Sequence, residues 1–179
     1  FSEFARMPSP DKTEYNLIEV LDEVILLQVS GNPDIKIEKK YTNRTVLALI
    51  DQTMINQALN NLIKNAIESI EIALEQNLLQ KKIDALIKVE VITHEDNFLI
   101  KIHDNGVGLP KNRRQLFEPY VTSRQNGIGL GLAIVKKIVE EHDGFLELID
   151  AEIFEGFSHS GAIAQVSLPL FSYSAKLKV

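Results

Sequence analysis

The chain has 179 residues, of which 45% are hydrophobic and 25% are charged, which is enough for one compact domain with a filled core. It contains no cysteine, so disulfide frameworks and cysteine-based metal sites are excluded. The formal net charge of -6 argues against broad affinity for nucleic acid, and no apolar run approaches the roughly 20 residues that span a bilayer.

The first residues are predicted to be a boundary segment. Pro8 and Pro10 stop a helix that enters from upstream, so residues 1–12 are expected to be the tail of a preceding helix and a linker. The sequence begins at Phe1 rather than at a methionine, and we expect it to be a piece of a longer protein. Residues 13–171 would form one domain, and residues 172–179 a C-terminal tail.

Two helices and two strands are predicted in the first half of the chain. Asn16 and Asp51 can cap helices that run to about residues 30 and 74. Alternation of apolar and polar residues predicts strands at 35–41 and 45–50. The apolar face of the first helix would contain Leu17, Val20, Leu21, Val24 and Leu27.

The second half is predicted to contain a hairpin, a third helix and two final strands. In chain order, the pattern predicts strands at 86–93 and 98–103, a loop at 104–110, an irregular polar stretch at 113–126, a helix at 130–141 that Gly144 ends, and strands at 145–149 and 162–168. Residues 75–85 stay open between a helical extension and a surface loop. Because helices and strands mix without strict alternation, we expect a sheet covered by helices on one face.

Asn61 and Asn65 form the first candidate site. They lie four residues apart, so they share one side of the second helix, at the flank of its apolar stripe. Two amide oxygens there can bind a hard cation, and magnesium prefers oxygen ligands that it shares with substrate phosphates. The same amides could instead cap or bridge neighbouring backbone, because this spacing is a weak pattern by itself.

Asp104 marks the second candidate site, at the end of a predicted strand and just before Gly106 and Gly108. Glycine lets the backbone approach a ligand closely. A carboxylate at such a strand end can accept a hydrogen bond from an exocyclic amine, such as that of adenine, and a partner without the amine would leave it unpaired. An ordinary Asx-turn is the alternative. The neighbouring His103 is expected to be a strand residue rather than a ligand or base.

A glycine-rich stretch, Gly127–Leu132, leads into the third helix and forms the third candidate site. Helix N-termini expose N–H groups and a positive dipole end, which suit phosphate. The spacing Gly-x-Gly-x-Gly matches neither the Rossmann fingerprint nor a Walker A loop. Upstream, Thr122, Ser123 and Arg124 could reach terminal phosphates from a segment, 117–126, that has the length and polarity of a mobile lid. A flexible surface loop is the alternative.

Taken in order, these motifs resemble the catalytic ATP-binding domain of two-component sensor histidine kinases, over residues 15–170. The segments that match the family's N box, first glycine box, F box and second glycine box are 59–66, 104–108, 116–120 and 127–134. Residues 1–8 further resemble the segment after the dimerisation helices in nitrogen-regulation kinases of the NtrY type. The resemblance implies an α/β two-layer sandwich of the Bergerat (GHKL) type, with a mixed sheet packed on three main helices and ATP between helix and lid.

The resemblance also implies roles for the helix and loop residues. Asn65 would be a magnesium ligand and Asn61 its partner, facing metal or phosphate. Asp104 would hold the adenine amino group, and Gly106 and Gly108 would shape the adenine pocket.

On the phosphate side, the resemblance places Thr122 and Ser123 in the lid and Arg124 against the γ-phosphate. The phosphate-side backbone would be formed by Gly127, Gly129, Leu130, Gly131 and Leu132. The catalytic set would then be Asn61, Asn65 and Arg124, acting on ATP with Mg²⁺.

The implied reaction transfers the γ-phosphate to a histidine on the parent's dimerisation domain, for relay to a response-regulator aspartate. That acceptor is normally followed by an acidic residue on a dimerisation helix, and His142 matches the helix after the lid instead. We therefore expect the chain to bind ATP without phosphorylating itself. The expected partners are the parent's own dimerisation domain and a response regulator, with no nucleic acid. The parent is expected to be a homodimer anchored in the inner membrane, with this domain in the cytoplasm.

Three positions depart from the family pattern. Ile128 stands where Thr or Ser is common, Asp143 where glycine is common, and Glu68 where many relatives carry a base, so phosphate charge must be met elsewhere. Two other hypotheses stay open: a nucleotide sensor that has lost transfer, and an ATPase of the chaperone, mismatch-repair or topoisomerase type. Those ATPases usually place a glutamate at the Asn61 position and lack Phe-Glu-Pro-Tyr.

Overall fold

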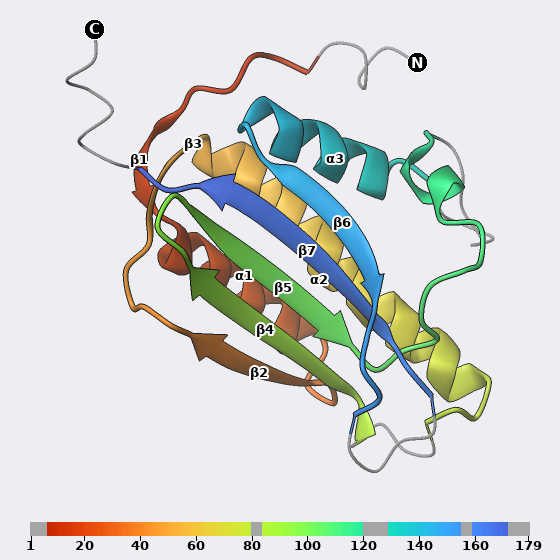
Figure 1. Ribbon diagram of the computed structural model, residues 1–179. Helices are drawn as coiled ribbons and strands as arrows, with labels where there is room; N and C mark the ends of the chain where they lie inside the picture. The colour runs from red at the N-terminus through yellow and green to blue at the C-terminus, as the bar shows by residue number, and fades with distance from the viewer. Residues whose placement is uncertain (1–6, 80–83, 120–128, 155–158, 172–179) are drawn as a thin grey trace, which may run out of the picture.

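The computed structural model describes residues 7–79, 84–119, 129–154 and 159–171. A five-stranded mixed sheet forms one layer, in the order β2-β4-β5-β7-β6, and Figure 1 shows the helices on one of its faces. β2 runs parallel to β4, and the other neighbouring strands are antiparallel. The strands are β2 (Lys36–Tyr41), β4 (Leu86–Thr93), β5 (Asn97–Asp104), β6 (Phe145–Asp150) and β7 (Ala162–Pro169). The predicted sandwich, a mixed sheet with three main helices, is confirmed.

The helical layer consists of α1 (Leu17–Gly31), α2 (Gln52–Glu75) and α3 (Gly131–Glu141). The two predicted caps are present: the Asn16 side chain accepts from the backbone N of Ile18 at 3.2 Å, and Asp51 accepts from Met54 N at 3.1 Å. Because these caps satisfy N–H groups that a helix leaves unpaired, they fix where α1 and α2 begin.

The core lies between α2 and the inner face of the sheet. Alternate residues of β4 and β5 point into it, and the α2 stripe covers them; the fully buried members include Leu59, Leu62, Ile63, Ile70, Ile87, Phe98 and Ile100. The predicted α1 stripe was wrong at one position, because Leu27 is 63% exposed and Ile18 and Ile25 are buried instead. At about 100° per residue, Leu27 turns past the edge of the stripe that faces the core.

Two elements were not predicted from the sequence. β1 (Thr13–Asn16) pairs antiparallel with β3 (Leu47–Ile50) in a separate two-stranded sheet. Within the irregular polar stretch, η3 (Arg114–Phe117) forms a 3₁₀ turn. The open question at residues 75–85 resolves in part, because α2 ends at Glu75 and a turn follows, while residues 80–83 lie outside the described chain.

The end of α3 differs from the prediction. Asp143, with φ of 58°, takes the left-handed position, so Gly144 is not the residue that turns the chain. Gly144 N donates to Val139 O at 2.9 Å. Gly144 is still needed there, because a Cβ on it would lie 2.4 Å from Ser167 O of β7. Within the described residues, none of the helices is both long and apolar enough to cross a membrane.

Candidate active site

One cavity of about 980 Å³ lies where α2, the end of β5, the loop after β5 and the start of α3 meet. Its wall contains many of the residues singled out from the sequence: Asn61, Asn65, Asp104, Gly108, Gly129, Leu130, Gly131 and Leu132. These positions span 72 residues of sequence, and the fold brings them around a single hollow. Thr122, Ser123, Arg124 and Gly127 lie outside the described residues.

The asparagines of α2 have divided tasks. Asn60 is held by its neighbours, because it accepts from Gln28 Nε2 at 3.0 Å and donates to Asn56 O at 3.0 Å. Asn61 and Asn65 line the cavity. A Cβ built on Gly131 would stand 3.7 Å from Asn61 Oδ1, so the Asn61 amide lies beside the first turn of α3. Asn60 therefore bridges neighbouring groups, whereas Asn61 and Asn65 lie in the cavity wall.

Asp104 is the last residue of β5 and is only 5% exposed. Its Oδ1 accepts from Gly106 N at 2.9 Å and from Ser69 Oγ at 3.1 Å. Burial raises the pKa of Asp104 to about 6, although these hydrogen bonds act in the opposite direction. The Asx-turn and the functional interpretation are thus compatible, because the turn fixes the carboxylate in the cavity wall.

Ser69 completes this end of the site and was missed by sequence reasoning. It follows Asn65 by four residues, so it lies on the same side of α2, and it also lines the cavity. That spacing was the signal that could have found it. The wall beside Ser69 and Asp104 is largely apolar, being formed by Ile102, Val107, Leu148, Ala162 and Ala164. A flat heteroaromatic group fits such a lining, with one carboxylate to fix its orientation.

Gly106 and Gly108 follow Asp104, and each has its own role. A Cβ on Gly106 would lie 2.2 Å from Ser69 Oγ and 2.4 Å from the backbone C of Ser69. Gly106 therefore lets the loop touch α2, and it is absent from the residues that line the cavity. Gly108 does line it, with φ of 78°. Of the two glycines that were expected to shape the cavity, Gly108 forms part of its wall. Gly106 acts only indirectly, by letting the loop pack against α2.

Asn105 is a buried residue that sequence reasoning did not single out. Its Oδ1 accepts from Leu86 N at 2.9 Å, and its Nδ2 donates to Asp84 O at 2.7 Å. It ties the loop after β5 to the start of β4. The carboxylate of Asp104 is therefore held from three directions, by the strand, by Asn105 and by α2.

The opposite end of the cavity is the N-terminus of α3. Leu130 occupies the N-cap position without a side-chain hydrogen bond, and Gly129 has φ of 70°. The first N–H groups of a helix attract anions when no side chain caps them. The cavity thus has an apolar end with one carboxylate, amides along α2, and a helix N-terminus.

His142 is buried at the end of α3, with hydrogen bonds at both ring nitrogens. Its Nε2 accepts from Asp51 N at 2.9 Å, its Nδ1 lies 2.7 Å from Ile138 O, and the residue is 2% exposed. Nε2 thus joins the end of α3 to the N-cap residue of α2, and Nδ1 binds the backbone of the last turn of α3 itself. His103, as expected, is a strand residue, and its ring stacks against Phe154 with centroids 4.4 Å apart.

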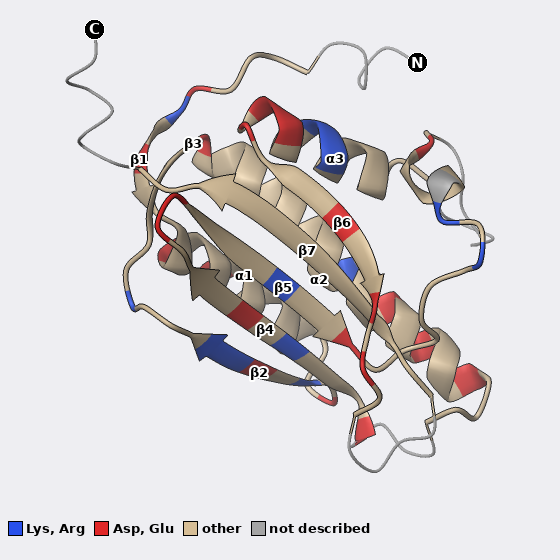
Figure 2. Cartoon of the chain, in the orientation of Figure 1, with Lys and Arg blue, Asp and Glu red and all other residues tan. Residues whose placement is uncertain are grey.

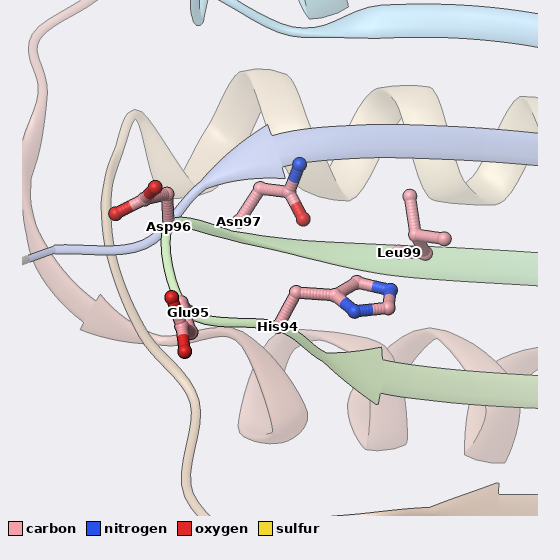
Figure 3. A pocket seen from close by; sticks show the side chains of 5 residues that line it. All are labelled: His94, Glu95, Asp96, Asn97 and Leu99. Carbon is pink, nitrogen blue, oxygen red and sulfur yellow. The ribbon is translucent and has the colours of Figure 1, made fainter.

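Three other features of the described residues were considered as sites: a second hollow, the charged face of the sheet and the basic run before η3. A hollow of about 430 Å³ lies at the β4–β5 turn, where Figure 3 shows that Asp96 points away from His94 and Asn97. In Figure 2, charges of both signs are interspersed on β2, β4 and β5, which is typical of a solvated sheet face. In the basic run before η3, Arg113 pairs with Asp150.

A metal ion would need ligands beyond the protein. In the parts of the chain that the structure describes, no three His, Asp or Glu side chains lie close enough together to hold one. The cavity wall offers the amide oxygens of Asn61 and Asn65 and the carboxylates of Glu68 and Asp104. This set fits an ion such as magnesium that arrives bound to phosphate oxygens.

The comparisons with known proteins agree with this geometry. Residues 50–172 match the family model described as "Histidine kinase-, DNA gyrase B-, and HSP90-like ATPase". The chain is 40% identical over 152 residues to the nitrogen regulation protein NtrY of Azorhizobium caulinodans, an alignment that covers 84% of this chain. The same alignment covers 19% of NtrY, so the chain spans about a fifth of that relative.

Solved structures show the same fold. The mycobacterial sensor histidine kinase MprB superposes with a TM-score of 0.75 at 24% identity, covering 89% of this chain and 97% of that one. The histidine kinase ThkA, solved in complex with the response regulator protein TrrA, superposes with a TM-score of 0.66 at 24% identity, covering 89% of this chain and 42% of that one.

Proposed function

The chain belongs to the family of histidine kinase-, DNA gyrase B- and HSP90-like ATPases, and we propose that it is the catalytic ATP-binding domain of a sensor histidine kinase. It binds ATP with Mg²⁺ and donates the γ-phosphate to a histidine on the dimerisation domain of its parent, for relay to a response-regulator aspartate. The observation that carries this proposal is the single cavity that Asn65, Asp104 and Gly129 share.

Adenine is assigned to the apolar end of the cavity. The Asp104 carboxylate accepts a hydrogen bond from the exocyclic amine, and Ser69 and Gly106 hold that carboxylate in place. In a desolvated wall, a base without the amine leaves the carboxylate unpaired, which discriminates against it. Guanine carries a carbonyl oxygen at the ring position where adenine carries its amine, so we expect guanine nucleotides to bind poorly.

The phosphates are assigned to the end where Asn61 meets α3. The uncapped first turn of α3 offers N–H groups to them, and Gly129 and Gly131 let the backbone approach closely. Asn65, with Asn61 beside it, would hold the magnesium ion through amide oxygens, and the ion would offset the charge of the phosphates. Phosphoryl transfer depends mainly on such positioning and charge stabilisation. Arg124, with Thr122 and Ser123, remains our prediction for contacts at the γ-phosphate.

Partners follow from the same proposal. The acceptor histidine lies on the dimerisation domain of the parent, which we propose to be a membrane-anchored homodimer. A response regulator receives the phosphate, in keeping with NtrY as a relative and with the complex of ThkA and TrrA. ATP and Mg²⁺ are the ligands of this domain itself.

Calorimetric titration with ATP tests the binding half of the proposal. Asp104→Ala should abolish measurable binding, because it removes the group that reads the amine. Asn65→Ala should retain binding but lose most of the dependence on magnesium. If Asp104→Ala binds ATP as the unchanged protein does, the assignment of the adenine end is wrong.

Trans-phosphorylation tests the transfer half. When the chain is mixed with isolated dimerisation helices of its parent and radiolabelled ATP, label should appear on those helices and not on this chain. Rapid multi-turnover ATP hydrolysis without any acceptor would instead favour an ATPase of the chaperone or topoisomerase type. We expect slow hydrolysis, because the Asn61 position carries no carboxylate to activate water.

A further inference from the structure

The peptide unit between Asn105 and Gly106 is held from both of its sides. Its N–H is that of Gly106, which donates to Asp104 Oδ1 at 2.9 Å. Its carbonyl oxygen, that of Asn105, lies 3.0 Å from His159 Nε2. Because a trans peptide is planar and its C=O and N–H point in opposite directions, His159 and the Asp104 carboxylate hold one rigid unit between them.

The direction of the bond from His159 follows from its acceptor. A backbone carbonyl oxygen can only accept, so His159 Nε2 carries a proton and donates it to Asn105 O. The neutral ring with its proton on Nε2 and the charged ring can both do this. A hydrogen bond to the C=O group polarises the peptide and strengthens its N–H group as a donor. His159 therefore reinforces the hydrogen bond that Gly106 makes to Asp104.

The backbone that carries His159 packs closely against the same loop. A Cβ on Gly161 would clash with Asp104 O and would lie 2.9 Å from Asn105 Cα. Gly161 O also accepts from Ala151 N at 3.1 Å, which ties this segment to the residue after β6. The place of His159 is therefore set by direct contact with the loop that it supports.

His159 reaches Asp104 only through this peptide unit, because it is not among the described residues that line the cavity. Asn105 is 0% exposed, so a chain without the His159 donor leaves a buried carbonyl with one partner fewer. Glycine restricts its backbone little, so the Asn105–Gly106 peptide can then rotate toward another donor. Such a rotation takes the Gly106 N–H group away from Asp104 Oδ1 and loosens the carboxylate.

We propose that His159 is a positioning residue for recognition of the base: it fixes the Asn105–Gly106 peptide unit, and that unit aims the Asp104 carboxylate at the exocyclic amine of adenine. This inference rests on the proposed function and deepens it, because it names a residue between β6 and β7 that sets the preference for adenine. His159 acts at the apolar end of the cavity, so it affects which base is bound and leaves the phosphate end as it is.

Calorimetric titration with ATP and with inosine triphosphate tests this, because hypoxanthine carries a carbonyl oxygen where adenine carries its amine. In His159→Leu, which removes the donor at similar volume, ATP affinity should fall about fivefold, as expected for one hydrogen bond, and inosine triphosphate affinity should stay the same. The loss is partial because Ser69 still donates to Asp104. His159→Gln, whose Nε2 can donate to Asn105 O, should recover most of the preference for ATP. His94→Leu, at the exposed β4–β5 turn, is the matched control and should keep it.

The preference for ATP separates a loss of aim from general damage to the fold. Damage would weaken both nucleotides equally and leave the preference unchanged, and an unchanged preference in His159→Leu overturns the inference while the proposed function stands. If His159→Leu does not fold, nitrogen NMR of the unchanged protein decides: a slowly exchanging proton on His159 Nε2 supports the inference, and a bare Nε2 overturns it. An unchanged protein that binds ATP no better than inosine triphosphate contradicts the adenine assignment as well.

Discussion

The buried carboxylate of Asp104 lowers the stability of the fold at neutral pH. The carboxylate is buried at the end of β5, and burial raises its pKa to about 6, from an ordinary value of 3.8. Because the folded chain holds this proton more tightly than the unfolded chain, the contribution of Asp104 to stability is greatest below pH 3.8 and is lost as the pH rises through 6. At neutral pH the Asp104 carboxylate is therefore charged, although this charge destabilises the folded chain. A destabilising charge of this kind is typical of a functional group.

Replacing Asp104 by Asn should remove this pH dependence. The amide oxygen of Asn can still accept from Gly106 and Ser69, but it does not titrate. Between pH 4 and pH 7.5, the unfolding free energy of Asp104→Asn should rise by about 1–3 kcal/mol relative to that of the unchanged protein. Urea denaturation at the two pH values measures this. A difference that stays constant with pH would show that Asp104 is not the group responsible.

At the scale of single residues, the sequence predicted those site residues that can be recognised by their residue type and their spacing along the chain. The four-residue spacing of Asn61 and Asn65 and the glycines after Asp104 can be read directly. Ser69 can be found by its four-residue spacing from Asn65, but its hydrogen bond to Asp104 cannot. The role of Asn105 likewise depends on partners that only folding brings near. Glu68 was visible as a departure, but its place in the wall comes from the structure.

The joint between α3 and α2 depends on a neutral histidine. His142 Nε2 accepts from Asp51 N, so Nδ1 carries the proton and donates to Ile138 O. Burial lowers the pKa of His142, and the nearby Lys12 lowers it too, whereas Asp51 and Asp143 raise it. Because the folded chain binds this proton less tightly, stability from His142 is present above pH 6.5 and is lost as the pH falls below it. The sign is opposite to that of Asp104.

His142→Gln should remove this acid sensitivity. The Gln oxygen can accept from Asp51 N, but the bond to Ile138 is lost, so the variant should be less stable by about 1–2 kcal/mol at pH 7.5. At pH 5 the difference in unfolding free energy between the variant and the unchanged protein should be smaller. Only the unchanged protein loses stability as the pH falls, because its folded state disfavours protonation of His142. Denaturation curves at both pH values test this. His94→Gln, at the exposed β4–β5 turn, should follow the unchanged protein, and a similar narrowing there would contradict the assignment.

Contact between the loop after β5 and α2 can be tested with one methyl group. Gly106→Ala would place a Cβ 2.2 Å from Ser69 Oγ and 2.4 Å from Ser69 C, so the loop or the helix must shift. We expect a loss of about 1–3 kcal/mol in unfolding free energy and weaker ATP binding, because Asp104 moves with the loop. Gly31→Ala at the end of α1 is the control, since nothing lies within 4 Å of its Cβ. If both variants match the unchanged protein, the loop is not held by this contact.

Elements with a clear period were predicted, and those without one were not. α2 and the β4–β5 hairpin have sustained helical or alternating patterns, and their bounds fell within a residue or two of the prediction. β1 has four residues and no buried side, so its sequence carries no alternation, and it exists because β3 offers it an edge. The residue with left-handed backbone after α3 is Asp143 rather than Gly144, because Gly144 packs closely against β7.

For the whole molecule, the sheet is what turns three separate motifs into one site. β5 lies in the centre of the sheet and carries Asp104 to one end of it, while α2 and α3 pack side by side across the inner face. The sequence alone could place each motif on an element, but their convergence depends on the strand order β2-β4-β5-β7-β6. Family resemblance predicted a mixed sheet packed on three main helices, but the order of the strands comes from the structure.

A shared cavity implies that one ligand orders segments far apart in the sequence. With ATP and magnesium at about 100 times the dissociation constant, binding should stabilise the fold by about 2.7 kcal/mol. Hydrogen exchange should slow together in residues 107–109 and 129–132, because both segments line the same cavity. The β4–β5 turn at residues 94–97 lies at the second hollow and should exchange as before. In Asp104→Ala both protected segments should revert together, and protection of one without the other would mean that the motifs do not share a ligand.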